Sequence, residues 1–195
     1  METSLDKLKK ECADNRFYSF GTAKLFERRA KTYRRNRNLI TFLGLAVPLV
    51  IGGTVLSFST GSEALKAILI PAAGVLTLLQ LVISLWALVS RWDEKNDYAV
   101  SAIKSNTRLT AEFNRLCNSS DEVINSEIPH LRDEYNRVNQ EDTAHGVTEK
   151  EIRWGMRKAL IHYNLNCPTC NEKPVSMTPS NCDICGNFPK RYNWV

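Results

Sequence analysis

Histidine is scarce in this sequence, and the motifs of common catalytic chemistry are missing. Only His130, His145 and His162 occur among 195 residues, and none stands beside a candidate nucleophile. The sequence contains no phosphate-binding loop, no G-x-G-x-x-G, no H-E-x-x-H and no nucleophile elbow. We therefore expect neither an enzymatic activity nor a small-molecule substrate.

Charged residues are nearly absent between Leu39 and Ser90, where Glu63 and Lys66 are the only two. The two uncharged runs, 38–62 and 67–90, each exceed the roughly 20 residues that cross a bilayer as a helix. Helices satisfy their own backbone groups in lipid, so the runs predict a transmembrane hairpin. A buried hairpin in a soluble core is disfavoured, because core helices rarely run this long without charge.

The hairpin is expected to turn over residues 60–66, and its second helix to begin near Pro71, which suits a first helical turn. Basic residues flank the hairpin on both sides, whereas the turn offers only Lys66. Because basic residues stay on the cytoplasmic side, both termini are expected in the cytoplasm. A reducing cytoplasm disfavours structural disulfides among the six cysteines.

The basic residues before the first run have two interpretations. They orient the hairpin, or they also bind anionic lipid headgroups or a partner. The candidates for this binding are Arg28, Arg29, Arg34, Arg35 and Arg37.

Within the hairpin, small and polar residues recur at helical spacing. Gly44 and Gly52 lie on one face of the first run and would allow a close approach of helices. Thr77, Gln80 and Ser84 form a polar stripe on the second run. The stripe is explained either by hydrogen bonds between helices or copies, or by a water-filled path in an oligomer.

The flanking regions predict further helices, so the fold class is mainly α. An N-terminal helix is expected to end at Gly21, with Thr22 capping the next one. Thr148 and Glu151 form a capping box that opens a helix to about Tyr163. The predicted organisation is N-terminal helices in 1–37, the hairpin in 38–90, cytoplasmic helices in 91–165 and a zinc ribbon in 166–195.

The C-terminal region carries the most specific motif, C-x2-C-x11-C-x2-C. Two thiolates from each pair can complete a tetrahedral four-sulfur site, and Gly186 would let the backbone turn back over the metal. Zinc is the preferred ion, and four cysteines make its role structural; iron or four free thiols are the alternatives. The ligands are Cys167, Cys170, Cys182 and Cys185, while Cys12 and Cys117 are taken as buried thiols outside the set.

Basic and aromatic residues alternate at the end of the chain. Lys190 and Arg191 lie between Phe188 and Tyr192, followed by Trp194. Such a segment can hold nucleic acid through phosphate contacts and stacking, or its aromatic side chains can pack against the small metal module.

Two segments at the membrane borders, AKTYRRNRNLITFLG at 30–44 and SRWDEKNDYA at 90–99, resemble SLATT-domain proteins. These are effectors of bacterial conflict systems with two membrane helices. The C-terminal region resembles a variant from mobile genetic elements with the same cysteine spacing. The resemblance implies an inner-membrane, abortive-infection effector that oligomerises and forms a pore or disrupts the membrane.

The resemblance also implies a separate sensor, either of a nucleotide-signal system or a retron reverse transcriptase with its nucleic acid. The alternative is a membrane-anchored zinc-ribbon adaptor that recruits a protein or nucleic acid without forming a pore.

Overall fold

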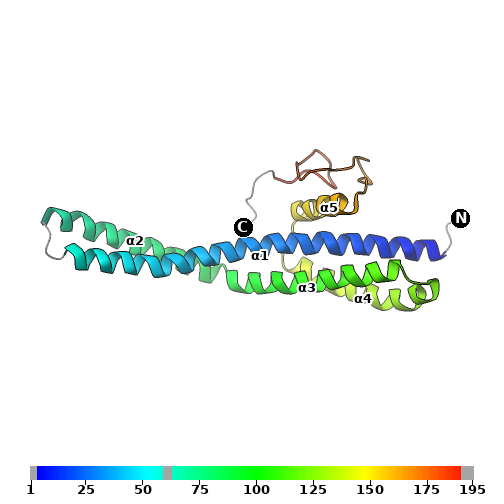
Figure 1. The fold of residues 1–195 in the computed structure, drawn as a ribbon, viewed down its shortest axis with the longest axis horizontal. Helices are drawn as coiled ribbons and strands as arrows, with labels where there is room; N and C mark the ends of the chain where they lie inside the picture. Colours follow the sequence, from blue (N-terminus) through cyan, green and yellow to red (C-terminus); the bar gives the residue numbers. More distant parts are fainter. Residues whose placement is uncertain (1–3, 59–62, 190–195) are drawn as a thin grey trace. The chain divides into compact units, whose positions relative to one another are not determined.

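The computed structural model describes residues 4–58 and 63–189, and it confirms a mainly α fold. Within these ranges there are five helices and no β-strand. The helices are α1 (Ser4–Phe58), α2 (Glu63–Val89), α3 (Trp92–Cys117), α4 (Asp121–Ala144) and α5 (Glu149–Tyr163) (Figure 1). The residues after α5 form turns.

The chain divides into two compact units. One unit comprises Ala30–Asp97, and the other joins the residues up to Arg29 with those from Tyr98 onward. We call them the hairpin unit and the helix–cysteine unit. The helix–cysteine unit holds the cysteine motif together with α4 and α5.

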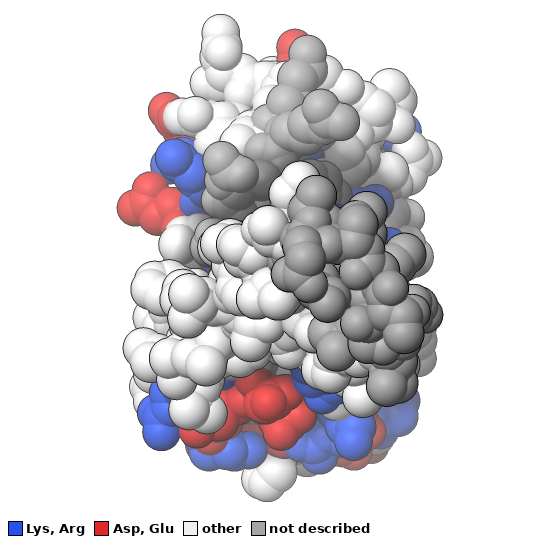
Figure 2. Space-filling view, turned by 90° about the vertical axis from the view of Figure 1, so that its left-hand side faces the viewer, with Lys and Arg blue, Asp and Glu red and all other residues white. Residues whose placement is uncertain are grey.

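In the hairpin unit, the C-terminal part of α1 runs beside α2 (Figure 1). Both helices are long and apolar enough to cross a membrane, as judged from length and composition. No residue of Ile70–Val89 is buried, and large side chains such as Leu49 and Leu88 are each 75 % exposed. Figure 2 shows a broad uncharged surface beside the undescribed grey residues. Such a surface is stable only in an apolar environment or against a partner.

The start of α2 differs from the prediction. The helix begins at Glu63, so Pro71 lies inside it instead of in its first turn. A proline inside a helix removes one backbone hydrogen bond, and this loss did not end the helix, as is common in long apolar helices. The expected turn is therefore shorter at its C-terminal side, and residues 59–62 lie outside the described ranges.

The predicted helix break at Gly21 is wrong, because α1 continues through it to Phe58. Gly21 is buried where α1 crosses α5 at Gly155. A Cβ atom on Gly155 would lie 2.7 Å from the carbonyl oxygen of Gly21, and one on Gly21 would lie 3.0 Å from that of Gly155. Both glycines thus serve close backbone packing, not helix termination.

The core of the helix–cysteine unit brings α1, α3 and α4 together. Cys12 lies fully buried among Leu109, Phe113 and Leu116 of α3 and apolar residues of α4. Its thiol donates to the carbonyl oxygen of Phe113 at 3.1 Å, and the Sγ of Cys117 is 2.8 Å from that of Cys12. Burial, followed by the Cys117 contact, raises the pKa of Cys12 to about 12. Both thiols lie outside the metal motif, as expected, but they contact each other.

The capping box at the start of α5 is confirmed, and it is part of a larger ionic contact. Thr148 and Glu151 exchange hydrogen bonds. Arg29 of α1 also donates to both carboxylate oxygens of Glu151, at 2.6 and 2.7 Å. Arg29 also donates to the carbonyl oxygens of His145 and Gly146. Burial alone would raise the pKa of Glu151, but the hydrogen bonds of Arg29 and Thr148 hold it below its usual value.

Replacing Arg29 with glutamine is expected to cost about 3 kcal/mol of unfolding free energy, because Glu151 would remain buried without its cation. The side chains are only 13 % and 7 % exposed, so solvent screens the pair little. Urea unfolding of Arg29→Gln, Glu151→Gln and the double variant measures the coupling. Additive effects of the two substitutions would contradict the interpretation.

The lowered pKa of Glu151 also sets a pH dependence. Its contribution is fully present above the unfolded-state pKa of about 4.3 and is lost as the pH falls toward the lower folded-state pKa. Glu151→Gln should therefore remove part of the acid-induced loss of stability. The Arg153–Glu149 pair offers the control, because Glu149 is 84 % exposed. Glu149→Gln should leave the loss of stability at acid pH unchanged.

Candidate metal centre

The cysteine pairs lie on two turns of similar construction that follow α5. That helix ends at Tyr163, and the next residue, Asn164, caps it in a left-handed conformation with φ 58°. In the first turn the N–H of Asn171 donates to the carbonyl oxygen of Cys167, and in the second the N–H of Gly186 donates to that of Cys182, both at 2.9 Å. Each bond closes a turn of five residues, so both thiols of a pair point to the same side.

Gly186 closes the second turn, where its lack of a side chain matters more than its backbone conformation. Among the described residues only Gly146 is a glycine with positive φ, and the left-handed residue here is Asn187, at φ 43°. A Cβ on Gly186 would lie 2.2 Å from the carbonyl oxygen of Ser180. Gly186 is thus required for the space that it leaves, because the chain before the second pair passes directly against it.

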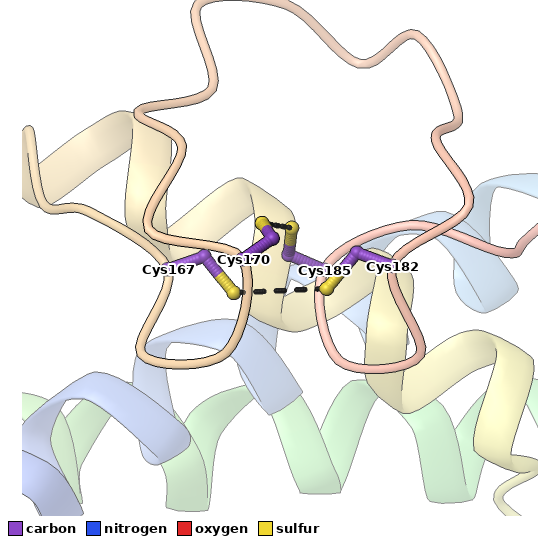
Figure 3. Close-up of side chains that lie close together, drawn as sticks. All are labelled: Cys167, Cys170, Cys182 and Cys185. Atoms are coloured by element: carbon purple, nitrogen blue, oxygen red, sulfur yellow. Dashed lines mark hydrogen bonds between the residues drawn. The ribbon is translucent and has the colours of Figure 1, made fainter.

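The four sulfur atoms meet between the two turns (Figure 3). Cys167 and Cys182 are 3.9 Å apart at Sγ, Cys170 and Cys185 are 3.7 Å apart, and all four atoms lie within 4.8 Å of one another. A tetrahedral zinc–thiolate centre with bonds of about 2.3 Å has sulfur–sulfur edges of about 3.8 Å. The four thiols therefore fit one structural zinc ion, with no coordination position left for a substrate.

The four cysteines differ in burial and in the pKa of their thiols. Cys167 and Cys185 are buried against Leu160 of α5, whereas Cys170 and Cys182 are half-buried. Backbone hydrogen bonds, first that of Cys185 and then that of Ile184, lower the pKa of Cys182 to about 7. Burial raises the pKa of Cys185. Metal binding would therefore have to supply the free energy that deprotonates this thiol. The packing of Leu160 and Phe17 on the cluster joins the metal centre to α5 and α1.

The predicted hairpin residues are not all brought together. Gln80 is half-buried toward α1, where a Cβ on Gly44 would lie 3.8 Å from its Nε2. Thr77 and Ser84 are exposed, and the hydroxyl of Thr77 donates to the carbonyl oxygen of Ala73 in its own helix. Gly52 is exposed, with no atom within 4 Å of a Cβ built on it. The polar stripe is thus divided between the inside and the outside of the hairpin.

The predicted basic residues also differ in their surroundings. Arg29 is held by Glu151, and Arg28 lies over the ring of Trp154 at 4.7 Å. Arg37 pairs with Asp93 at 3.6 Å, while Arg34 and Arg35 are exposed. Lys190 and Arg191 lie outside the described residues.

Arg157 was missed as a site residue. In the sequence it reads as one of several basic residues on α5, and the only signal was its position three residues before the apolar Leu160. In the structure it is buried beside the metal centre. Its Nη1 is 3.1 Å from the carbonyl oxygen of Cys185 and 4.0 Å from the Sγ of that residue.

Comparison with known proteins agrees with this arrangement. A family described as "Mobilome CxxCx(11)CxxC protein" matches residues 9–188. The matched range includes four whole helices, α1 from Lys9 onward and all four cysteines. No curated protein and no solved structure matches the chain. Because the match covers nearly the whole sequence, the chain belongs to the Mobilome CxxCx(11)CxxC protein family.

Proposed function

We propose that this protein is an inner-membrane effector of a bacterial anti-phage system, which assembles and breaches the membrane when a partner senses infection. The observation that carries the membrane part is the uncovered apolar surface of α2, where no residue of Ile70–Val89 is buried. An apolar helix of this length whose side chains are left largely uncovered suits a bilayer. We place both termini in the cytoplasm, since Arg34, Arg35 and Arg37 precede the hairpin and Arg91 follows it.

The effector part rests on the resemblance of residues 30–44 and 90–99 to SLATT-domain proteins. The family description supports it, because it places such proteins in the mobilome. Two helices cannot enclose a channel, so the proposal requires several copies. In that assembly the exposed Thr77 and Ser84 face the neighbouring copies or the permeation path, and Gln80 joins α2 to α1. The trigger is a separate sensor protein, of a nucleotide-signal system or a retron.

One observation favours the second candidate, a membrane-anchored adaptor. Gln80 lies half-buried against α1, and the Thr77 hydroxyl donates to a carbonyl oxygen of its own helix, so neither side chain requires a pore. In that case the hairpin only holds the metal module at the membrane, and the module recruits a protein or nucleic acid.

The inner-membrane potential distinguishes the two candidates. It is measured with a voltage-sensitive dye in phage-infected bacteria that carry the native neighbouring genes. For an effector, wild type depolarises the cells and the double variant Thr77→Val, Ser84→Ala loses most of the response. Thr41→Val is the matched control, because Thr41 is an exposed threonine of the first run and should respond as wild type.

For an adaptor, the stripe variants and Gln80→Leu retain protection against phage, whereas Cys167→Ser abolishes it. Infected cells that keep their potential with well-expressed wild type would overturn the pore. Loss of response in all variants, with Thr41→Val included, would mean that the polar stripe has no special role.

A further inference from the structure

Arg157 makes more contacts with the metal module than its place in the sequence indicates. It is 7 % exposed, although arginine is seldom buried without a partner. Its Nε donates to the carbonyl oxygen of Ser176 at 2.7 Å, and its Nη1 to that of Cys185 at 3.1 Å. Nη1 is also 3.4 Å from the hydroxyl of Ser180. One guanidinium thus joins α5 to the segment between the cysteine pairs and to the second pair itself.

The positive charge of Arg157 also bears on the metal centre. A zinc ion with four thiolate ligands carries a net double negative charge. The guanidinium is a cation, and its Nη1 lies 4.0 Å from the Sγ of Cys185. Cys185 is 1 % exposed, so water screens this attraction little. The cation is therefore placed where it offsets charge on one particular ligand.

We propose that Arg157 is a positioning residue of the metal centre, which fixes the backbone of Cys185 and supplies part of the counter-charge of the thiolate cluster. Groups that orient metal ligands contribute strongly to metal retention, and their loss typically costs about 10- to 100-fold in affinity. This role is independent of the membrane function, because it concerns only residues of the helix–cysteine unit.

The affinity test uses the full chain in detergent, with zinc titrated against a chromogenic chelator. Arg157→Met removes both the hydrogen bonds and the charge, and should raise the zinc dissociation constant about 10- to 100-fold. Arg157→Lys keeps the charge but cannot reach Ser176 and Cys185 together, so an intermediate rise is expected. The matched control is Arg153→Met, one turn earlier on α5, whose guanidinium pairs with Glu149.

Alkylation of the zinc-loaded protein separates the counter-charge from a purely structural role. With Arg157→Met, iodoacetamide should modify Cys185 faster than the other three cysteines, as read by mass spectrometry, because zinc keeps its sulfur as a thiolate and the negative charge on that sulfur is no longer offset. Lysine should restore the slow rate at Cys185. A structural role alone would expose all four cysteines together and would gain nothing from lysine.

Unchanged zinc affinity and unchanged Cys185 alkylation in Arg157→Met overturn the proposal. If that variant does not fold, Arg157→Lys decides. A dissociation constant equal to that of wild type, with the lysine variant folded, overturns the positioning role. A rise equal to that of Arg153→Met overturns it as well, because α5 in general would then be responsible.

Discussion

Replacing Cys167 with serine is expected to abolish stoichiometric zinc binding and to unfold the segment between α5 and residue 189. This segment has no regular secondary structure and few buried apolar side chains apart from Phe188 and the cysteines themselves. In modules of this kind metal binding supplies the folding energy, with an apparent binding free energy of about 10–16 kcal/mol for structural zinc. Purified wild type should carry about one zinc per chain, and the variant close to none, by plasma mass spectrometry.

Cys117→Ser is the control for this prediction, because Cys117 contacts Cys12 and lies outside the metal cluster. It should keep the full zinc content and leave the C-terminal segment resistant to protease. Cys167→Ser should instead be cleaved within residues 164–189 while α3 and α4 remain protected. A variant that keeps both zinc and protection would exclude Cys167 as a ligand.

Gly155→Leu is expected to be strongly destabilising and to separate α5 from α1. By helix propensity alone, replacing a glycine with leucine should gain close to 1 kcal/mol. Here even the first carbon of the new side chain would lie 2.7 Å from the carbonyl oxygen of Gly21, which is backbone and cannot rotate away. Overpacking of this kind typically costs 1–3 kcal/mol, so we expect a net loss of about 2 kcal/mol for leucine.

Thermal unfolding of the detergent-purified chain measures this loss as a lower Tm. Gly74→Leu is the matched control, since Gly74 is also helical but no atom lies within 4 Å of a Cβ built on it. That variant should unfold at the wild-type temperature or slightly above it. An equal Tm for Gly155→Leu and wild type would contradict the close crossing of α1 and α5.

The features that the sequence predicted well are encoded by neighbouring residues. The Thr148–Glu151 capping box and each pair of the four-cysteine set depend on spacings of a few residues. Each of these spacings determines its own geometry, because the groups that interact are held close by the chain itself. The uncharged runs belong to the same class, and they predicted the positions of two long apolar helices.

The features that the sequence did not reveal join residues far apart in the chain. Gly21 has the local signature of a helix end, but α1 continues through it, and the close contact with Gly155 accounts for the glycine there. The contacts of Arg29 with Glu151 and of Cys12 with Cys117 likewise depend on how the helices pack. From the sequence Arg157 is expected to face solvent, but in the structure the turns after α5 cover it. Local propensity is overridden at such sites by tertiary packing.

The central claim, that the hairpin breaches a bilayer, is tested most directly by potassium release from sealed vesicles containing the purified protein. At high protein-to-lipid ratios, where copies meet without the sensor, vesicles with wild type, whose insertion is verified by alkali extraction, should release potassium, and the Thr77→Val, Ser84→Ala variant should release far less. The Thr41→Val control should match wild type. If inserted wild type releases no potassium at any protein-to-lipid ratio, and infected cells also keep their membrane potential, the pore is contradicted and the hairpin is an anchor.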